Sequence, residues 1–151
     1  LRSAIDDLVL RTTLITGFPG ETGEQFNELL EFVEWAEFDA LGCFKYYQEP
    51  GTKAARMANQ VPEYVKDERL EKLMLVQQRI AFEKNRDRIG SKICCLADSA
   101  DDKNTGRGRF YGQAPEIDSV CIIKNCSAKP GQFINARVVE TENYDLLVEQ
   151  V

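Results

Sequence analysis

The order of predicted elements in the first half of the chain is the strongest constraint on its fold. Residues 8–16 are rich in β-branched and apolar side chains and stop at Gly17, as a buried strand does before a tight turn. Residues 22–37 are helical in pattern, and residues 39–47 are again strand-like. Two strands joined through a helix pair in parallel with a right-handed crossover. This half of the chain therefore predicts part of an α/β sheet or barrel.

The predicted helix over residues 22–37 has a start signal and two distinct faces. Thr22 and Gln25 have the spacing of a capping box. Apolar side chains recur at helical intervals on one face, and glutamates occupy the other. The apolar set is Phe26, Leu29, Leu30, Val33 and Ala36, and the acidic set is Glu24, Glu28, Glu31 and Glu34. The helix is thus expected to bury one side and leave an acidic side in water.

The pattern changes at Gly90. Pro62 suits the first turn of a long helix, and no residue breaks that helix before Gly90. Its inner stripe is Leu70, Leu73, Met74, Gln77, Ile80 and Ala81. After Gly90, five short strand-like segments are separated by turn-forming residues, which predicts a small antiparallel five-stranded β-barrel, because closure removes exposed sheet edges. We expect residues 1–89 and 90–151 to form separate domains.

The titratable residues exclude several kinds of site. The chain has no histidine, which rules out a Ser-His-Asp or Cys-His nucleophilic site and any zinc site with an imidazole ligand.

A formal net charge of −6 disfavours nonspecific binding to nucleic acid. No apolar run reaches the roughly 18 residues of a membrane span. The five cysteines fit no disulfide framework or metal motif, so we expect reduced thiols, mostly buried, in a cytoplasmic protein.

Residues 17–21, with the sequence GFPGE, lie between the first strand and the capped helix. A strand end that leads into a helix N-terminus suits an anionic or polar ligand group, and glycines let a ligand approach the main chain. The segment lacks the lysine of a phosphate-binding P-loop, so a plain tight turn is the alternative. In a parallel barrel, residues 44–52 would lie at the same end of the strands, where Tyr46 and Tyr47 either face a cofactor or pack in the core.

Longer stretches of the chain resemble one enzyme family. These stretches are RTTLITGFPGET (residues 11–22), FDALGCFKYYQEPGTKAARM (38–57), QVPEYVKDERLEKLMLVQQRI (60–80), APEID (114–118) and YDL (144–146). In order and spacing they resemble the radical S-adenosylmethionine methylthiotransferases over nearly the whole chain. The LGCF stretch, the Gln77-Gln78 pair and YDL are most similar to the branch that modifies an aspartate of the small-subunit ribosomal protein numbered twelve.

The resemblance implies a fold and a chemistry. Members of the family have an N-terminal domain, a central radical domain built as a partial or full (β/α) barrel, and an OB-like C-terminal barrel called TRAM. They use S-adenosylmethionine and two 4Fe-4S clusters, one of them held by a CxxxCxxC motif, to install a methylthio group. This chain lacks that motif and begins at Leu1 rather than Met. We therefore expect the end of the radical domain plus the TRAM module, with no catalytic residue, no metal ligand and no activity on its own.

The resemblance also implies particular contact residues. Those expected near S-adenosylmethionine are Arg11, Thr13, Gly17, Phe18, Pro19, Gly20, Glu21, Phe44 and Tyr46. Glu116 and Asp118 are expected to contact a partner through the TRAM module, with turn formation as the alternative. Independently of the resemblance, Arg107 and Arg109 form a small basic-aromatic patch with Phe110 and Tyr111, which is expected to contact a partner such as nucleic acid, with a solvated strand face as the alternative. Gln113 stands where the family more often has aspartate, which leaves its role open.

The charge of the last part of the chain bears on the substrate. From Gly90 onward, seven basic residues stand against nine acidic ones. This balance favours a basic ribosomal protein over RNA, because phosphate recognition requires excess positive charge. Transfer RNA, the substrate of a sibling branch, is therefore the second reading. A third reading is a noncatalytic nucleic-acid-binding adaptor, and no reading involves a membrane.

Overall fold

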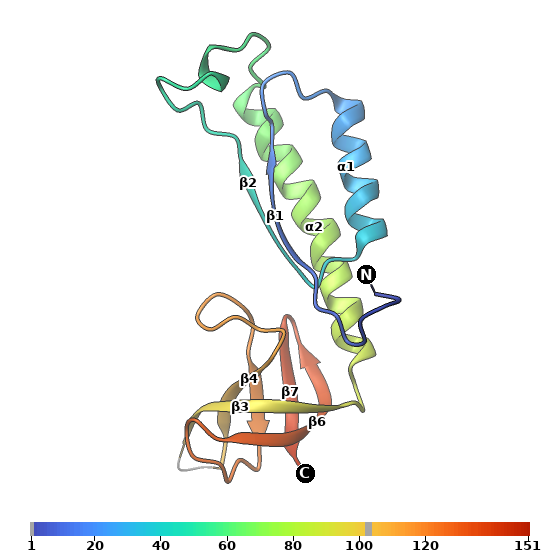
Figure 1. The fold of residues 1–151 in the computed structure, drawn as a ribbon, viewed down its shortest axis with the longest axis vertical. Coiled ribbons are helices and arrows are strands. Elements are labelled where there is room, and N and C mark those ends of the chain that lie inside the picture. The colour runs from blue at the N-terminus through green and yellow to red at the C-terminus, as the bar shows by residue number, and fades with distance from the viewer. Residues whose placement is uncertain (1, 102–103) are drawn as a thin grey trace. The chain divides into compact units, whose positions relative to one another are not determined.

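The computed structural model describes residues 2–101 and 104–151, and the chain separates into two compact units, Leu1–Ala81 and Phe82–Val151 (Figure 1). The first unit contains β1 (Arg11–Thr16), α1 (Gly23–Ala36), β2 (Ala40–Lys45), a short 3-10 helix (Ala54–Arg56) and most of α2 (Glu63–Asp87). The second contains the end of α2, β3 (Lys92–Ala100), β4 (Gly106–Phe110), β5 (Cys121–Lys124), β6 (Phe133–Glu142) and β7 (Asp145–Gln150). Within the described residues, neither helix is long and apolar enough to cross a membrane.

The first unit is an α/β unit, as the sequence predicts. β1 and β2 pair in parallel, with Arg11 opposite Ala40 and Thr16 opposite Lys45 (Figure 1). The core lies between this sheet and the two helices, and its members are Phe26, Leu30, Val33, Leu41, Leu73 and Ile80. That the sheet forms part of a larger (β/α) barrel stays a prediction.

α1 begins where its capping signal predicts. The Gln25 amide donates to the Thr22 hydroxyl at 3.2 Å, and the Gln25 side-chain oxygen accepts from the Thr22 amide at 3.0 Å. The helix ends at Glu37, whose φ of 47° is left-handed. These bonds satisfy amides that a helix N-terminus otherwise leaves unpaired, so a local signal fixes where α1 begins.

The second face of the β1–β2 sheet is open in the described part of the chain. Successive side chains of a strand point to opposite faces, and only one face is covered by helices. Thr16 and Leu41 are buried on the covered face, whereas Ile15 is 59% and Phe44 61% exposed on the other. An apolar surface therefore lies on the side of the sheet away from the helices.

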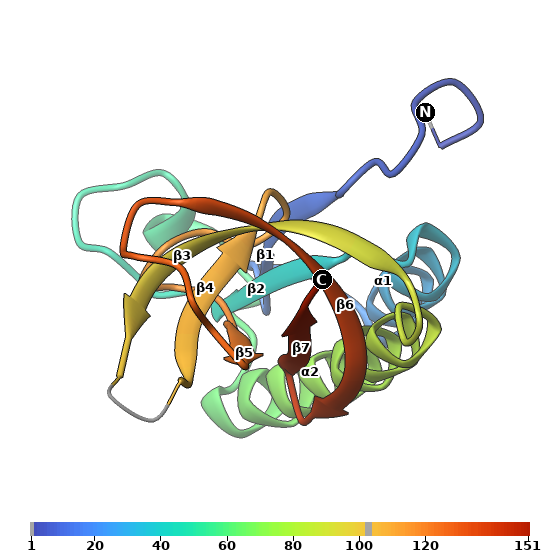
Figure 2. The ribbon, with the colours of Figure 1, turned by 90° about the horizontal axis from the view of Figure 1, so that it is seen from below.

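The second unit is a closed barrel with the strand order β3-β4-β5-β7-β6 among the described residues (Figure 2). The predicted five-stranded barrel is confirmed, with one correction: β5 and β7 run parallel, so the barrel is mixed rather than antiparallel. The cause is parity. A closed ring with an odd number of strands cannot alternate direction at every pair, so at least one neighbouring pair must run parallel.

The barrel interior is filled by small and medium side chains. Cys95, Ala97, Cys121, Ile123, Ala136, Val138, Leu146 and Val148 are 0–1% exposed. The described cysteines are free thiols, as predicted, although Cys94 points outward and is exposed. A hydrogen bond to the Cys95 thiol, together with burial, raises the pKa of Cys121. Cys95 and Cys121 are 0% exposed, so these two thiols pack as small apolar groups inside the barrel.

Candidate functional site

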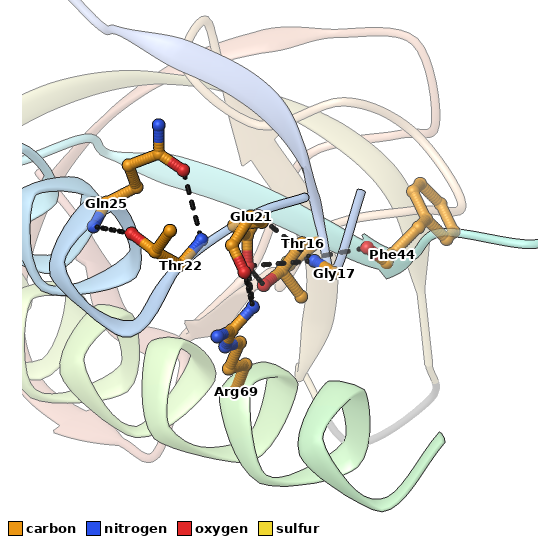
Figure 3. Close-up of polar contacts among 8 residues, drawn as sticks. Thr16, Gly17, Glu21, Thr22, Gln25, Phe44 and Arg69 are labelled. Atoms are coloured by element: carbon orange, nitrogen blue, oxygen red, sulfur yellow. Dashed lines mark hydrogen bonds and ion pairs between the residues drawn. The ribbon is translucent and has the colours of Figure 1, made fainter. Parts of the chain in front are cut away.

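A partly buried ion pair holds the turn at the carboxyl end of β1 (Figure 3). The Glu21 carboxylate turns back and accepts hydrogen bonds from the Thr16 hydroxyl at 3.2 Å and the Gly17 amide at 3.0 Å. Arg69 of α2 donates to the same carboxylate at 2.5 Å, and the Glu21 and Arg69 side chains are only 13% and 11% exposed. Charge-assisted hydrogen bonds in such a shielded place are strong, so the turn has one well-defined shape.

Three main-chain amides of this turn already have hydrogen-bond partners within the chain. The Gly20 amide donates to the Asn59 carbonyl at 2.9 Å, and the Glu21 amide donates to the Phe18 carbonyl at 2.9 Å. The Gly17 amide is bonded to the Glu21 carboxylate. These three amides are therefore not available to a ligand, and the binding of an anionic ligand at residues 17–21 stays a prediction.

Two glycines of the turn are required for different reasons. Gly17 and Gly20 have φ values of +77° and +87°, which L side chains rarely adopt. A Cβ atom at Gly17 would also lie 2.5 Å from Cγ of Lys66, whereas no atom lies within 4 Å of the corresponding position at Gly20. At position 17, a larger residue is thus disfavoured by both the backbone conformation and the contact with Lys66. At position 20, it is disfavoured by the backbone conformation alone.

Lys66 supports the turn from α2. Its side chain is 7% exposed, and its ammonium group donates to the Tyr46 carbonyl at 3.1 Å and to the Glu63 carboxylate at 3.2 Å. The ammonium nitrogen also lies 5.4 Å from the centroid of the Tyr46 ring. One buried cation therefore links the turn after β1 to the segment after β2.

An aromatic pair lies beside the turn. Phe18 and Tyr46 make an edge-to-face contact with ring centroids 5.3 Å apart. The Tyr46 amide donates to the Thr16 carbonyl at 2.8 Å, which extends the sheet by one residue. The Tyr46 hydroxyl is buried and has no hydrogen-bond partner in the described part of the chain. A buried hydroxyl without a partner is costly, so this atom suits a polar group supplied by a ligand.

The structure divides the nine residues expected near S-adenosylmethionine. Arg11, Thr13 and Phe44 lie on the open face of the sheet. Phe18 and Gly20 are exposed at its carboxyl end, where Tyr46 is half-buried. Gly17, Pro19 and Glu21 face inward and shape the turn. The first two groups are therefore positioned for contact with a ligand, and the third group for support.

The sequence interpretation missed the supporting residues of α2. Lys66 and Arg69 precede Leu73 by seven and four residues, which is the spacing of the inner stripe of the helix. A charged residue in line with an apolar stripe faces the protein interior and requires a partner there. That signal could have identified both residues, although it does not identify Glu21 as the partner.

Cys43 is the cysteine of the first unit. Burial and the charge of Glu21 raise its pKa, so it stays protonated at neutral pH. Within the residues that the structure describes, no three His, Cys, Asp or Glu side chains come together as a metal site. That the cluster ligands lie elsewhere stays a prediction.

A separate pocket of about 270 Å³ lies on the barrel. Its lining residues are Asp98, Arg109, Ala114, Pro115, Glu116, Ser119 and Val120. Of the expected partner contacts, the structure brings Arg109 and Glu116 together here, and Arg109 forms an ion pair with Asp98. Arg107 is exposed on β4 outside this lining. The Asp118 carboxylate accepts from the Ala114 amide at 2.6 Å, which is the turn-forming alternative for that residue.

Gln113 is a buried structural residue. Its side-chain oxygen accepts from the Phe110 amide at 3.1 Å and from the Cys121 thiol at 3.2 Å. Its amide group donates to the Ser119 hydroxyl at 3.2 Å. The sequence left the role of Gln113 open. In the structure its side chain has a role in the fold, because it forms its hydrogen bonds inside the barrel unit.

Comparisons with known proteins agree with the geometry. Residues 89–151 match the family model described as TRAM domain. The chain is 47% identical over 148 residues to a ribosomal protein uS12 methylthiotransferase of Carboxydothermus hydrogenoformans, a match that covers 97% of the chain and 34% of the relative. Proteins of the same name are 41% identical over 153 residues in Bdellovibrio bacteriovorus and 44% identical over 151 residues in Geobacter sulfurreducens. These matches cover 100% and 99% of the chain, and again 34% of each relative.

The class of the second unit follows from two observations: residues 89–151 contain the closed barrel, and they match the TRAM domain. Over nearly all of its residues the chain is homologous to the ribosomal protein uS12 methylthiotransferases, which confirms the family resemblance of its sequence motifs. The chain spans about a third of the length of these relatives.

Proposed function

We propose that this chain contributes to methylthiolation of an aspartate side chain of ribosomal protein uS12, in the cytoplasm and away from any membrane. The similarity to proteins of that name is the observation that carries the proposal. The open face of the β1–β2 sheet is its cofactor side, and the barrel is its partner side. The 151-residue chain alone is expected to be inactive.

The residues of the open face fit S-adenosylmethionine. The exposed Phe44 ring suits the flat adenine group, and a guanidinium such as that of Arg11 suits a carboxylate. The unpartnered Tyr46 hydroxyl would gain a hydrogen bond from a bound ligand. When bound, S-adenosylmethionine and the 4Fe-4S clusters supply the radical chemistry that cleavage of an unactivated C–H bond requires.

The contribution of the supporting residues is positional. Arg69 and Glu21 hold the turn through their ion pair, and Lys66 holds the segment after β2. Because catalysis is sensitive to small errors of placement, a turn fixed by several bonds keeps the ligand-facing side chains in one arrangement. The geometry thus supports binding and orientation on this chain rather than chemistry.

The barrel favours a protein partner over nucleic acid. Arg109 is neutralised by Asp98, and Glu116 adds negative charge to the same pocket. Phosphate groups are disfavoured at such a pocket, whereas a lysine or arginine side chain is attracted to it. A basic ribosomal protein is therefore the proposed partner, with transfer RNA as the second candidate and a noncatalytic adaptor as the third.

The test uses the natural polypeptide at full length, reconstituted anaerobically with iron and sulfide. We expect isolated uS12 to gain the mass of one methylthio group on one aspartate, and the 151-residue chain alone to give no product. Modification of transfer RNA instead would contradict the substrate assignment. The absence of any product with both substrates would favour the adaptor.

A matched pair of variants tests the cofactor side. Phe44→Ala should weaken S-adenosylmethionine binding about tenfold in calorimetry, the size of a lost aromatic stacking contact. Tyr64→Ala, at an aromatic that is 66% exposed on α2, removes a ring of similar exposure and should leave the affinity unchanged. Unchanged affinity for Phe44→Ala would remove the open face from the proposal.

A further inference from the structure

The outward side of α1 carries aromatic side chains in the open. Trp35 is 79% and Phe32 46% exposed, and their ring centroids lie 6.1 Å apart. Phe32 also contacts Phe38, with centroids 5.8 Å apart. Burial of such rings is favourable, so a group of exposed rings that touch one another indicates a surface for interaction.

Unpaired carboxylates share this side of α1. Glu31 and Glu28 precede Trp35 by four and seven residues, which places them on the same helical face. They and Glu24 are exposed and have no ion-pair or hydrogen-bond partner in the described part of the chain, whereas Glu34 pairs with Arg79 at 2.6 Å. The acidic-aromatic face of α1 is defined as Glu24, Glu28, Glu31, Phe32 and Trp35.

We propose that the acidic-aromatic face of α1 binds a basic, arginine-containing segment of a partner protein. A guanidinium group satisfies both features, because it stacks on an indole ring and pairs with carboxylates. Neighbouring like charges on a helix repel one another, and a bound cation relieves that repulsion. The carboxylates repel phosphate, so nucleic acid does not fit this face.

This surface is separate from the proposed cofactor side. α1 packs against the covered side of the sheet, whereas Phe44 and Ile15 lie on the open side. The inference goes beyond the proposed function and does not depend on it. Its failure would leave methylthiolation untouched, and the loss of methylthiolation would leave this surface in place.

The probe is a fluorescently labelled octaarginine peptide, and its anisotropy is measured as the 151-residue chain is added. Glu28→Gln/Glu31→Gln should weaken binding about tenfold, because charge attraction and carboxylate hydrogen bonds are lost together. Glu68→Gln/Glu71→Gln is the matched control. It makes the same charge change at the same spacing on exposed positions of α2, and it should weaken binding less than about twofold.

A third variant tests the ring. Trp35→Ala should weaken octaarginine binding about fivefold, as expected for loss of an exposed cation–π contact. Octalysine should bind more weakly than octaarginine, because the guanidinium stacks better on indole. Trp35 is the only tryptophan of the chain, so its emission in the unlabelled wild type should respond to octaarginine directly. Circular dichroism of each variant establishes that α1 is intact.

Four outcomes would overturn the proposal. The first is equal weakening by the two glutamate pairs, which indicates general charge attraction. The second is unchanged binding by Trp35→Ala, and the third is preferential binding of a duplex oligonucleotide. The fourth is shielding of Trp35 from acrylamide in the full-length natural polypeptide, which shows that another segment of that polypeptide covers the face. Tighter binding by the wild type than by both test variants supports the proposal.

Discussion

The barrel closes its sheet on itself, whereas the β1–β2 sheet of the α/β unit is covered on one face only. Val138 and Val148 inside the barrel are fully buried. On the open face of the other sheet, Ile15 and Phe44 remain more than half exposed. Closure pairs the strand edges and buries the inner face together, so the barrel needs no further cover.

The difference indicates where a ligand can be received. In the α/β unit, the exposed residues of the candidate site lie on a surface that the described chain leaves unpacked. The turn beside that surface is held by polar contacts, chiefly the Glu21–Arg69 pair, and the segment after β2 is held by a hydrogen bond from Lys66. The barrel is stabilised by its interior. The α/β unit has in addition the Glu21–Arg69 ion pair, called the polar clamp below, next to its open face. Variants that remove either the packing inside the barrel or the polar clamp of the α/β unit therefore test this comparison of the two units.

The largest effect is expected for Gly108→Ala in the barrel. The added Cβ would lie 2.4 Å from the Leu96 carbonyl oxygen and 3.0 Å from the Ile123 side chain. Main-chain atoms of a closed ring cannot move freely, so we expect a loss of about 3 kcal/mol in the free energy of unfolding. Amide hydrogen exchange should show about a hundredfold loss of protection in the barrel strands.

Gly23→Ala is the matched control for this prediction. Gly23 begins α1, and a Cβ at that position meets no atom within 4 Å. Alanine is also the better helix former, so protection in α1 should stay the same or rise slightly. Equal loss of protection in α1 and the barrel after Gly108→Ala, or no loss in the barrel, would contradict the view that closure carries the barrel's stability.

The second prediction concerns the polar clamp of the α/β unit. Arg69→Met leaves the Glu21 carboxylate without its cation in a place that is 13% exposed. We expect a loss of about 2 kcal/mol, less than for a fully buried pair, in urea unfolding followed by Trp35 emission. The double variant Glu21→Gln/Arg69→Met should recover part of that loss, because no unpaired charge remains.

An exposed ion pair provides the control for the clamp. Arg79 and Glu34 pair at 2.6 Å with side chains that are 52% and 51% exposed. Arg79→Met should cost less than about 0.5 kcal/mol, because water screens the pair. A similar loss for Arg69→Met and Arg79→Met would show that burial adds nothing to the clamp, and the contrast with the barrel would disappear.

Local sequence patterns predicted where helices and strands lie, but they did not predict which strands and side chains pair with one another. The capping box placed the start of α1, and the inner stripe of α2 holds Leu73, Gln77 and Ile80 as expected. The parallel β5–β7 pair was missed, because strand order is set by closure of the whole ring. The Glu21–Arg69 pair was missed for a related reason: its partners are 48 residues apart, and only the packed fold brings them together.

The smallest effect is expected for the surface cluster of Lys45, Glu63 and Asp67. The Lys45 ammonium lies 2.6 Å from both carboxylates. Its hydrogen bonds lower the pKa of Glu63 below the ordinary 4.5, and bonds to Asp67 and Glu63 raise the pKa of Lys45 above 10.5. The stability from Glu63 is thus present above pH 4.5 and lost as the pH falls through its folded-state pKa. The stability from Lys45 is present below pH 10.5 and lost as the pH rises through its folded-state pKa.

Carbon-detected NMR titration of the Glu63 carboxyl group measures this effect. The midpoint should lie below 4.5 in the wild type and rise toward 4.5 in Lys45→Met. Because the cluster is at the surface, about 1 M salt should move the wild-type midpoint in the same direction. The Glu21–Arg69 clamp is shielded, so the stability lost on Arg69→Met should depend little on salt. Equal salt sensitivity of the cluster and the clamp would mean that water reaches both, and that the turn beside the open face is no better fixed than the surface around it.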